Sequence, residues 1–335
     1  MKKIASFLAL ILLILGVVSA ACADQDEKLC QTALPYTKYF NERSLDSSTG
    51  FAGMTRSFQI YLGGHTPEEE AVINYGAAAY DQSILARINL AGGSTTILDT
   101  YLYYAQRLDD PLNPALNTNG NYYDANLMPL KNGPYRIIRI LGRWDWSDWW
   151  SNWDWIVDTG AAACLVIDSL EAYGKTSNAD YRSFAILLGD YILKLQDTDG
   201  GIRYGPRGMF HYPEPQSDFY WNLKSTEQNE RALYAFCALY DETRDAKYLQ
   251  SAQNIKTWLK GMYDPGVHLF SSAATFNGTA WEKSDFSYVA TDVTAFAPLE
   301  MMFEDSFFGL TQTARDEEVD NMFLAIEART AFYDT

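Results

Sequence analysis

Four acidic side chains stand at the start of four predicted apolar helices, and this arrangement could support chemistry. They are Asp81, Asp158, Glu227 and Asp292. Acids in a first helical turn are often structural, because they cap free N–H groups and oppose the helix dipole. Ser225 with Gln228 fits a capping box in the same way. Each acid taken singly is therefore explained most simply as a cap.

Taken together, the four acids suit general acid and base catalysis. Packed helices lie about 8–10 Å apart, and enzymes that cleave a glycosidic bond with inversion hold two carboxyl groups about 6.5–9.5 Å apart, with room for a water. Glu227 is the candidate acid, because it is the only glutamate of the four and lies close to Trp221. Asp158 is the candidate base, and Asp292 is the alternative base.

Aromatic residues are concentrated just before these helices. The stretch 143–155 holds six tryptophans and leads into Asp158, while Trp221 precedes Glu227. Pyranose rings stack on aromatic faces, but a long loop also needs a small core of its own, so these tryptophans have two explanations. Arg203 has two as well, since it could bind an acidic sugar group or pair with a surface acid. The candidate sugar-binding residues are Asp81, Trp153, Trp155, Trp221 and Arg203.

Other chemistries find little support in the sequence. The three histidines, His65, His211 and His268, lack the spacing of zinc ligands. No nucleophile elbow, phosphate-binding loop or dinucleotide fingerprint occurs, so we expect neither a metal nor a cofactor. Acidic residues outnumber basic ones 43 to 26, for a net charge of −17. That charge would repel a phosphate backbone, which argues against nucleic acid as a partner.

An internal repeat indicates how the acids are positioned. Two stretches carry Tyr, Thr and Tyr at the same spacing, 67 residues apart, and each stretch separates an apolar helical pattern from an amphipathic one. The matching residues are Tyr173, Thr176 and Tyr181 in the first stretch, and Tyr240, Thr243 and Tyr248 in the second. Repeats of this length built from helix pairs predict a repeat architecture.

The repeat predicts an all-α fold, an (α/α) toroid of helical hairpins in a single domain, 24–335. Apolar helices would form an inner ring and amphipathic helices an outer ring. The expected hairpins are 81–91 with 95–108, 159–173 with 181–196, 226–240 with 248–263, and 292–303 with 314–332. The long outer-to-inner connections all emerge on the face that holds the inner-helix N-termini, which is where function is expected.

The first residues are typical of an export signal. Lys2 and Lys3 precede an apolar run, 4–18, that is too short to span a bilayer comfortably. Cleavage is expected after Ala21 or Ala23; the first site resembles a lipobox and would leave Cys22 lipidated. We therefore expect a periplasmic or extracellular protein and favour free secretion; the alternative is a lipid anchor at Cys22, which would be its only contact with a membrane.

Cys164 and Cys237 each lie on an apolar helical stripe. We expect both to be buried free thiols, with a disulfide as the alternative that export would permit.

The chain resembles the six-hairpin glycosidase superfamily over residues from about 51 to 335. The resemblance lies in 80–83 (Tyr-Asp-Gln-Ser), 158–161 (Asp-Thr-Gly-Ala), 225–229 (Ser-Thr-Glu-Gln-Asn), the Tyr-x-x-Thr repeats and 199–201 (Asp-Gly-Gly). It is similar to exported bacterial members. The resemblance implies an (α/α)6 toroid, and it implies inverting hydrolases with a Glu acid and an Asp base near inner-helix N-termini. Polysaccharide lyases and sugar epimerases share the shape. The epimerases use a pair of histidines, and none of the three here begins an inner helix.

These observations predict a secreted, monomeric carbohydrate-active enzyme, similar to an inverting glycoside hydrolase, that acts on poly- or oligosaccharide. The alternatives are a polysaccharide lyase, and a non-catalytic glycan-binding or envelope scaffold protein. Six hairpins at the observed period would need roughly 420 residues, whereas the chain has 335. Four hairpins are clear, and 29–43 with 58–61 could supply part of a fifth. We therefore expect an incomplete ring, from a truncated sequence or an unusually short toroid.

Overall fold

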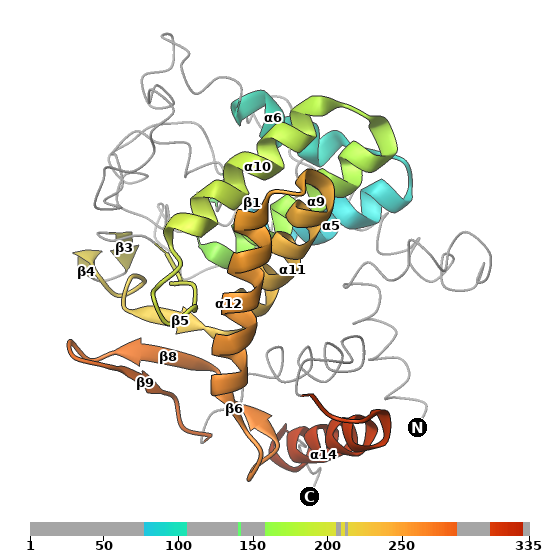
Figure 1. The fold of residues 1–335 in the computed structure, drawn as a ribbon. Coiled ribbons are helices and arrows are strands. Elements are labelled where there is room, and N and C mark those ends of the chain that lie inside the picture. Colours follow the sequence, from blue (N-terminus) through green and yellow to red (C-terminus); the bar gives the residue numbers. More distant parts are fainter. Residues whose placement is uncertain are drawn as a thin grey trace, which may run out of the picture.

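The computed structural model describes residues 77–105, 140–141, 158–205, 209–211, 214–286 and 309–330 (Figure 1). The helices are α5 (Ala79–Ala91), α6 (Thr96–Ala105), α9 (Thr159–Thr176), α10 (Ala179–Lys194), α11 (Thr226–Thr243), α12 (Ala246–Met262) and α14 (Gln312–Thr330). Short strands lie between them: β1 (Ala77–Ala78), β2 (Ile140–Leu141), β3 (Met209–His211), β4 (Glu214–Ser217), β5 (Leu223–Ser225), β6 (Tyr263–Asp264), β7 (Leu269–Phe270), β8 (Ala273–Phe276) and β9 (Trp281–Lys283).

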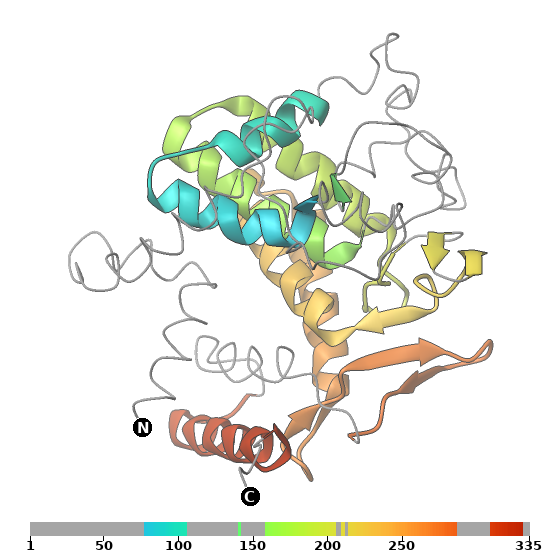
Figure 2. The ribbon, with the colours of Figure 1, turned by 180° about the vertical axis from the view of Figure 1, so that it is seen from behind.

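Three consecutive helical hairpins form the body of the described structure, namely α5–α6, α9–α10 and α11–α12 (Figure 2). Helix α9 packs against α5 on one side and α11 on the other, so these three form the inner layer. Their partners α6, α10 and α12 form the outer layer. Every residue of 159–166 in α9 is buried, as expected of a helix covered on all sides. The predicted toroid architecture is confirmed.

The hairpin turns repeat in atomic detail, which explains the Tyr-x-x-Thr signature. Thr176 Oγ1 donates to the Ala172 carbonyl at 2.7 Å and accepts from the Asn178 amide at 3.2 Å. Thr243 makes the two equivalent bonds, to Leu239 O and from the Asp245 amide. Between them, Ser177 and Arg244 both adopt φ 58° to close the helix. The threonine therefore ends one helix and helps to begin the next.

The second tyrosine of each repeat joins consecutive hairpins. The Tyr181 hydroxyl donates to Asp99 of α6, and the Tyr248 hydroxyl donates to Asp190 of α10 at 2.8 Å. Burial is the largest cause of a raised phenol pKa at both positions, and the hydrogen bond to the carboxylate adds to it, so that each pKa rises to about 12. Each pair therefore ties one outer helix to the next.

Because the pKa values of Tyr181 and Tyr248 are raised in the folded protein, we expect the fold to lose stability at alkaline pH. A pKa above the unfolded value of about 10 means that their contribution is complete below pH 10 and is lost as the pH rises through about 12. The variant Tyr181→Phe/Tyr248→Phe should unfold more easily at pH 8, by about 1 kcal/mol for each lost hydrogen bond. Urea unfolding at pH 8, 10 and 11 should show the difference from wild type shrinking as the pH rises. A pH-independent difference would contradict this role.

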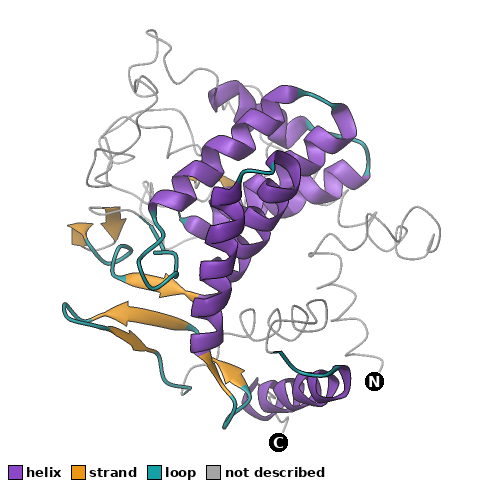
Figure 3. Cartoon of the chain, viewed as in Figure 1, coloured by secondary structure: helices purple, strands orange, loops and turns teal. Residues whose placement is uncertain are grey.

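The strands lie in the connections between hairpins, at the end of the helices opposite the hairpin turns (Figure 3). Antiparallel strands β5, β8 and β9 form a sheet in the order β5-β8-β9, with Ser225 opposite Ala273. Strands β6 and β7 form a small hairpin, and α14 packs on β7. Glu318 of α14 accepts the Tyr263 hydroxyl and lies 2.9 Å from His268 Nδ1. The long connections thus carry ordered structure on the face expected to hold the site.

A buried ion pair joins two inner helices. Arg87 of α5 donates through Nε to Asp168 Oδ1 of α9 at 2.6 Å, and the Asp168 side chain is fully buried. Cys164 lies one helical turn away, and burial raises the pKa of its thiol. This polar pair was not among the residues expected to be important, because in the sequence it lies on otherwise apolar helices.

The expectation for the cysteines is half right. Cys164 is buried, but Cys237 is exposed, so its predicted burial is wrong. The buried stripe of α11 runs through Ala232, Phe236 and Leu239, whereas Cys237 shares the opposite side with the partly exposed Tyr234. The predicted inner helix 292–303, the export signal 1–23 and the fifth hairpin lie outside the described residues. Among the helices that are described, each is too short or too polar to cross a bilayer.

Candidate functional site

The candidate acid and base belong to neighbouring inner helices that start side by side. Asp158 immediately precedes α9, and Glu227 is the second residue of α11. The closeness of the two starts is clearest at Gly160, where an added Cβ would lie 3.0 Å from Gln228 Cγ and 3.5 Å from Asp158 Oδ1. A glycine at this position therefore lets the two helix ends approach. The structure therefore places Gln228, the residue after Glu227, beside the start of α9.

Asp158 is the N-cap of α9. Its Oδ1 accepts from the Ala161 amide at 2.7 Å, and the residue is 8% exposed. The next residue fixes the helix start to the following connection, because the Thr159 amide donates to Tyr204 O and its hydroxyl donates to Arg203 O. The capping role is therefore real. It also holds this carboxylate in a defined position beside α11, which a catalytic base would need.

Glu227 does not cap its helix, because Ser225 does. Ser225 Oγ accepts from the Gln228 amide at 3.5 Å, and the start of α11 repeats the anchoring of α9: Thr226 donates from its amide to Ser272 O and from its hydroxyl to Ser271 O. Glu227 is partly exposed, in contrast to its buried neighbours Thr226 and Gln228. The fold thus leaves this carboxylate at the surface of the face that carries the connections.

Gln228 follows Glu227 and lies close to Asp158, although its sequence pattern indicated only a capping role. Its side chain lies against Gly160, and its Oε1 is buried with no hydrogen-bond partner among the described residues. Buried acceptors without a partner are uncommon and call for an explanation. A water or a substrate hydroxyl donating to Oε1 would satisfy it.

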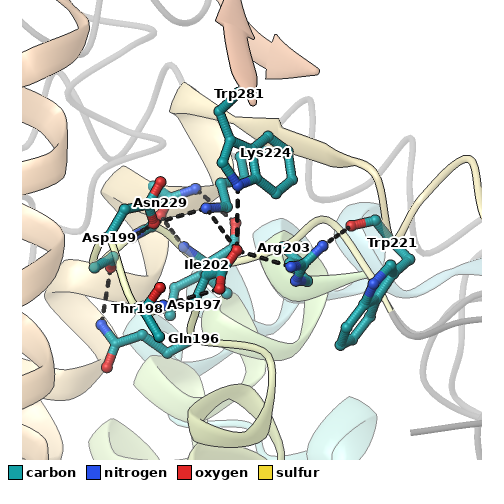
Figure 4. A network of polar contacts seen from close by, with 12 residues as sticks. Gln196, Asp197, Thr198, Asp199, Ile202, Arg203, Trp221, Lys224, Asn229 and Trp281 are labelled. Atoms are coloured by element: carbon teal, nitrogen blue, oxygen red, sulfur yellow. Dashed lines mark hydrogen bonds and ion pairs between the residues drawn. The ribbon is translucent and has the colours of Figure 1, made fainter. Parts of the chain in front are cut away.

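A polar network lies beside the start of α11 and centres on Asp197 (Figure 4). One oxygen, Asp197 Oδ2, accepts from Arg203 Nη2 at 2.8 Å and Trp281 Nε1 at 3.2 Å, and lies 3.1 Å from Lys224 Nζ. The other oxygen, Oδ1, accepts from the Thr198 amide. Asp197 therefore joins the connection after α10 to β5 and β9.

Arg203 is fully engaged in this network. Its Nη1 donates to Trp221 O at 2.7 Å, and its guanidinium carbon lies 4.0 Å from the centre of the Trp221 ring and 5.1 Å from that of Trp281. Of its two explanations from the sequence, pairing with an acid is the one that these contacts show. Trp221 is half-buried and packs against the arginine, so the guanidinium fixes the orientation of that indole.

Lys224 is the buried member of the network. It lies in the middle of β5 with no exposed side-chain area, 2.6 Å from Asp199 Oδ1, and its Nζ lies 3.9 Å from the centre of the Trp281 ring. Burial lowers the pKa of Lys224 more than its two carboxylates raise it. Burial raises the pKa of Asp197. The hydrogen bond from the Thr198 amide and the charges of Lys224 and Arg203 lower it by more, so the pKa lies below its ordinary value.

The turn 197–201, which supplies the carboxylates of Asp197 and Asp199, requires glycine at positions 200 and 201. Gly200 has φ +94°, and a Cβ there would lie 2.4 Å from Asn254 O. A Cβ on Gly201 would lie 2.6 Å from Trp258 Nε1. Asp199 Oδ1 also accepts from the Gly201 amide at 3.0 Å. This turn therefore packs closely on α12, and the carboxylates of Asp197 and Asp199 both lie beside Lys224 of β5.

An aromatic group borders the start of α9 as well. The rings of Tyr204 and Tyr220 have centroids 5.0 Å apart, and Phe219 meets Tyr220 edge-on at 5.1 Å. Phe219 is 45% exposed. Because the Tyr204 carbonyl accepts from the Thr159 amide, this group lies close to Asp158. The sequence gives no signal for this group, since three scattered aromatic residues carry no motif.

The remaining predicted site residues cannot be placed at this site. Asp292, Trp153 and Trp155 lie outside the described residues, and Asp81 is described only as the third residue of α5, the inner helix on the far side of α9. His211 lies in β3 and His268 in the β6–β7 turn, away from inner-helix starts. No cluster of three or more metal-binding side chains occurs among the described residues.

Solved structures share this fold. The α-1,6-mannanase of Salegentibacter sp. HEL1_6 matches 91% of this chain and 72% of its own, with 14% identity and a TM-score of 0.52. A D-mannose isomerase matches 90% of this chain and 70% of its own, with 11% identity and a TM-score of 0.54. Both structures share the fold of this chain, which is the (α/α)6 toroid that the resemblance implied.

A third structure matches a smaller part. This family 76 glycoside hydrolase from a bovine Bacteroides thetaiotaomicron strain has 18% identity and a TM-score of 0.36 over 52% of this chain. The match covers 36% of the relative, so the chain spans about a third of that protein's length. Neither a protein-family model nor a curated protein sequence matches the chain.

Proposed function

We propose that the protein is a glycoside hydrolase that cleaves poly- or oligosaccharide with inversion, with Glu227 as general acid and Asp158 as general base. The observation that carries this proposal is that the two carboxylates stand at adjacent starts of two neighbouring inner helices, α9 and α11. Two acids on helices packed about 8–10 Å apart meet the spacing that admits a water between base and sugar.

The two acids differ in exposure. Asp158 is nearly buried, and the hydrogen bond that it accepts from the Ala161 amide fixes the position of its carboxylate, as a base needs. Glu227 is partly exposed, so a leaving-group oxygen could reach it. Gln228 between them could accept from the attacking water or from a sugar hydroxyl through its unpaired Oε1. Asp292 remains the alternative base.

The aromatic side chains support a carbohydrate as ligand. Phe219, Tyr220 and Trp221 lie in the connection that leads into α11, and aromatic faces suit the C–H faces of pyranose rings. Asp81, Trp153, Trp155 and Arg203 complete the proposed sugar-binding set; Arg203 would act there by orienting Trp221. The mannanase with the shared fold has been solved with α-1,6-mannotetrose after two consecutive aspartates were substituted, which made it inactive. We take mannans as the first substrates to test.

The protein is proposed to act outside the cytoplasm, because Lys2 and Lys3, the apolar run and the small residues that follow are typical of an export signal. A lipid anchor at Cys22 is the alternative to free secretion.

The test is a glycan panel with mass spectrometry of the products. Full-length wild type incubated with α-1,6-mannan, other neutral glycans and uronic-acid glycans is expected to release saturated oligosaccharides. Unsaturated products that absorb in the ultraviolet would assign the chain to the lyases instead. Binding to a panel member without any product would favour the non-catalytic glycan-binding protein.

Asp158→Asn tests the base separately. Asparagine caps helices as well as aspartate does, so the free energy of unfolding should change by less than about 1 kcal/mol, while kcat should fall by about 10²–10⁴-fold because an amide cannot take a proton. Urea unfolding and initial rates on the same preparation measure both quantities. Unchanged kcat in a folded variant would shift the role of base to Asp292.

A further inference from the structure

Lys224 stands three residues before Glu227, at the point where β5 passes into α11. Strand β5 ends at Ser225, which caps the helix, and its partner β8 holds the strand on one edge. The side chain of Lys224 forms ion pairs with Asp197 and Asp199, and its ammonium group lies over the ring of Trp281. A displacement of Lys224 would therefore be passed along two residues of chain to the first turn of α11.

The internal repeat allows Asp197 and Lys224 to be compared with the residues at equivalent positions of neighbouring hairpins. Asp264 occupies the position equivalent to Asp197: each is followed by a turn in which its carbonyl accepts an amide three residues on, Gly200 in one case and Val267 in the other. Asp264 Oδ1 also accepts a turn amide, from Gly266. The backbone role of the aspartate is thus common to both repeats.

The side-chain role of Asp197 is not repeated. The residue equivalent to Lys224 is Val157 in the preceding repeat and Thr291 in the following one. Neither can form an ion pair. Of the three equivalent positions 157, 224 and 291, the one that precedes Glu227 holds a lysine, and in the described structure this lysine is buried with two carboxylates.

The cluster is balanced in charge. Two carboxylates, Asp197 and Asp199, face two cations, Arg203 and Lys224, and the ion pairs between them are 2.6–3.1 Å long. Because the four charges neutralise one another, the cluster is suited to fixing β5 against the turn 197–201 rather than to binding an ion. Removing one member would leave a buried charge without its partner, which is far more costly than losing a surface pair.

We propose that Lys224, held by Asp197 and Asp199, is a positioning residue that fixes the first turn of α11 and thereby the carboxyl group of Glu227. The proposal rests on the assignment of Glu227 as the general acid. Lys224 touches no substrate. It acts through β5, and its second contact orients Trp281 at the same time.

The test compares Lys224→Met with Lys224→Arg, and uses Asp264→Asn as the matched control in the equivalent turn. Hydrogen exchange of the full-length protein is followed by mass spectrometry in peptides covering 223–232 and 159–168. Lys224→Met should raise exchange in 223–232 about tenfold and leave 159–168 unchanged, because only one helix start is loosened. Lys224→Arg should restore part of the protection, and Asp264→Asn should leave both peptides as in wild type.

Activity on α-1,6-mannan, or on the panel glycan that wild type cleaves, gives the second measurement. Lys224→Met should lower kcat by about 10²-fold with KM changed less than about threefold, since a small misplacement of a catalytic group affects the chemical step most. If Lys224→Met does not fold, Asp199→Asn replaces it; it keeps the acceptor for the Gly201 amide and removes one charge, and a smaller change in the same direction is expected.

The outcomes separate the two proposals. Unchanged hydrogen exchange in 223–232 of Lys224→Met overturns the positioning role. Raised exchange with unchanged kcat in the same variant overturns it as well, and so does the same exchange pattern in Asp264→Asn. A wild type that cleaves nothing overturns the hydrolase, while the exchange experiment still decides whether Lys224 fixes the helix start.

Discussion

Glu227→Gln is expected to lower the rate of glycan hydrolysis by about 10²–10⁴-fold while glycan binding persists. Glutamine keeps the length and the polar contacts of the side chain, but it cannot give a proton to the leaving-group oxygen. Because Ser225 and not Glu227 caps α11, the helix should form normally in the variant. Initial rates, together with binding of the same oligosaccharide measured by calorimetry, would show the separation of binding from chemistry.

The matched control is Glu242→Gln, the same substitution near the other end of α11. Glu242 pairs with Arg182 on the outer layer, with both side chains about one-third exposed, and such a pair contributes about 0–1 kcal/mol. Its activity should equal that of wild type. If the two variants keep equal activity, Glu227 is not the acid, and the role would have to be sought outside the described residues.

Asp168→Ala is expected to destabilise the fold by about 3–5 kcal/mol, since it leaves the Arg87 guanidinium between two inner helices without its carboxylate. The pair spans α5 and α9, so its loss should loosen the inner layer as a whole. Urea unfolding followed by far-ultraviolet circular dichroism measures the change. Asp168 itself is fully buried, and solvent cannot replace the lost partner.

A double variant shows whether the cost comes from the unpaired charge. Arg87→Met/Asp168→Leu removes both charges at similar volume and should recover most of the stability lost in Asp168→Ala. A double variant that is no more stable than Asp168→Ala would mean that packing, rather than the unpaired cation, sets the cost.

The repeat explains why so much of the fold could be predicted. Thr176 and Thr243 end and begin helices through the same two bonds, so the periodic spacing in the sequence reflects a physical constraint. The starts of α9 and α11 were likewise predictable, because Asp158 and Ser225 are good caps. The expected outer helix 314–332 is observed as Gln312–Thr330.

Features that depend on which elements become neighbours were missed. The side of a helix that faces solvent is set by its partners, so the apolar pattern around Cys237 wrongly predicted burial. Lys224 gave no signal, since a lysine in a short strand is usually exposed, and only the fold brings it to Asp197 and Asp199. Arg203 had two explanations in the sequence, and its contacts with Asp197 and Trp221 became visible only in three dimensions.

Hydrolysis in H₂¹⁸O tests the central claim most directly. Wild type acting on α-1,6-mannan, or on the panel glycan that it cleaves, should place one ¹⁸O at each newly formed reducing end, because the attacking water becomes the new anomeric hydroxyl, while the leaving-group oxygen takes a proton. Glu227→Gln should form almost none of this product. Products without ¹⁸O, or no product from any glycan with wild type, would contradict the assignment of Glu227 and Asp158 as the acid and base of a hydrolase.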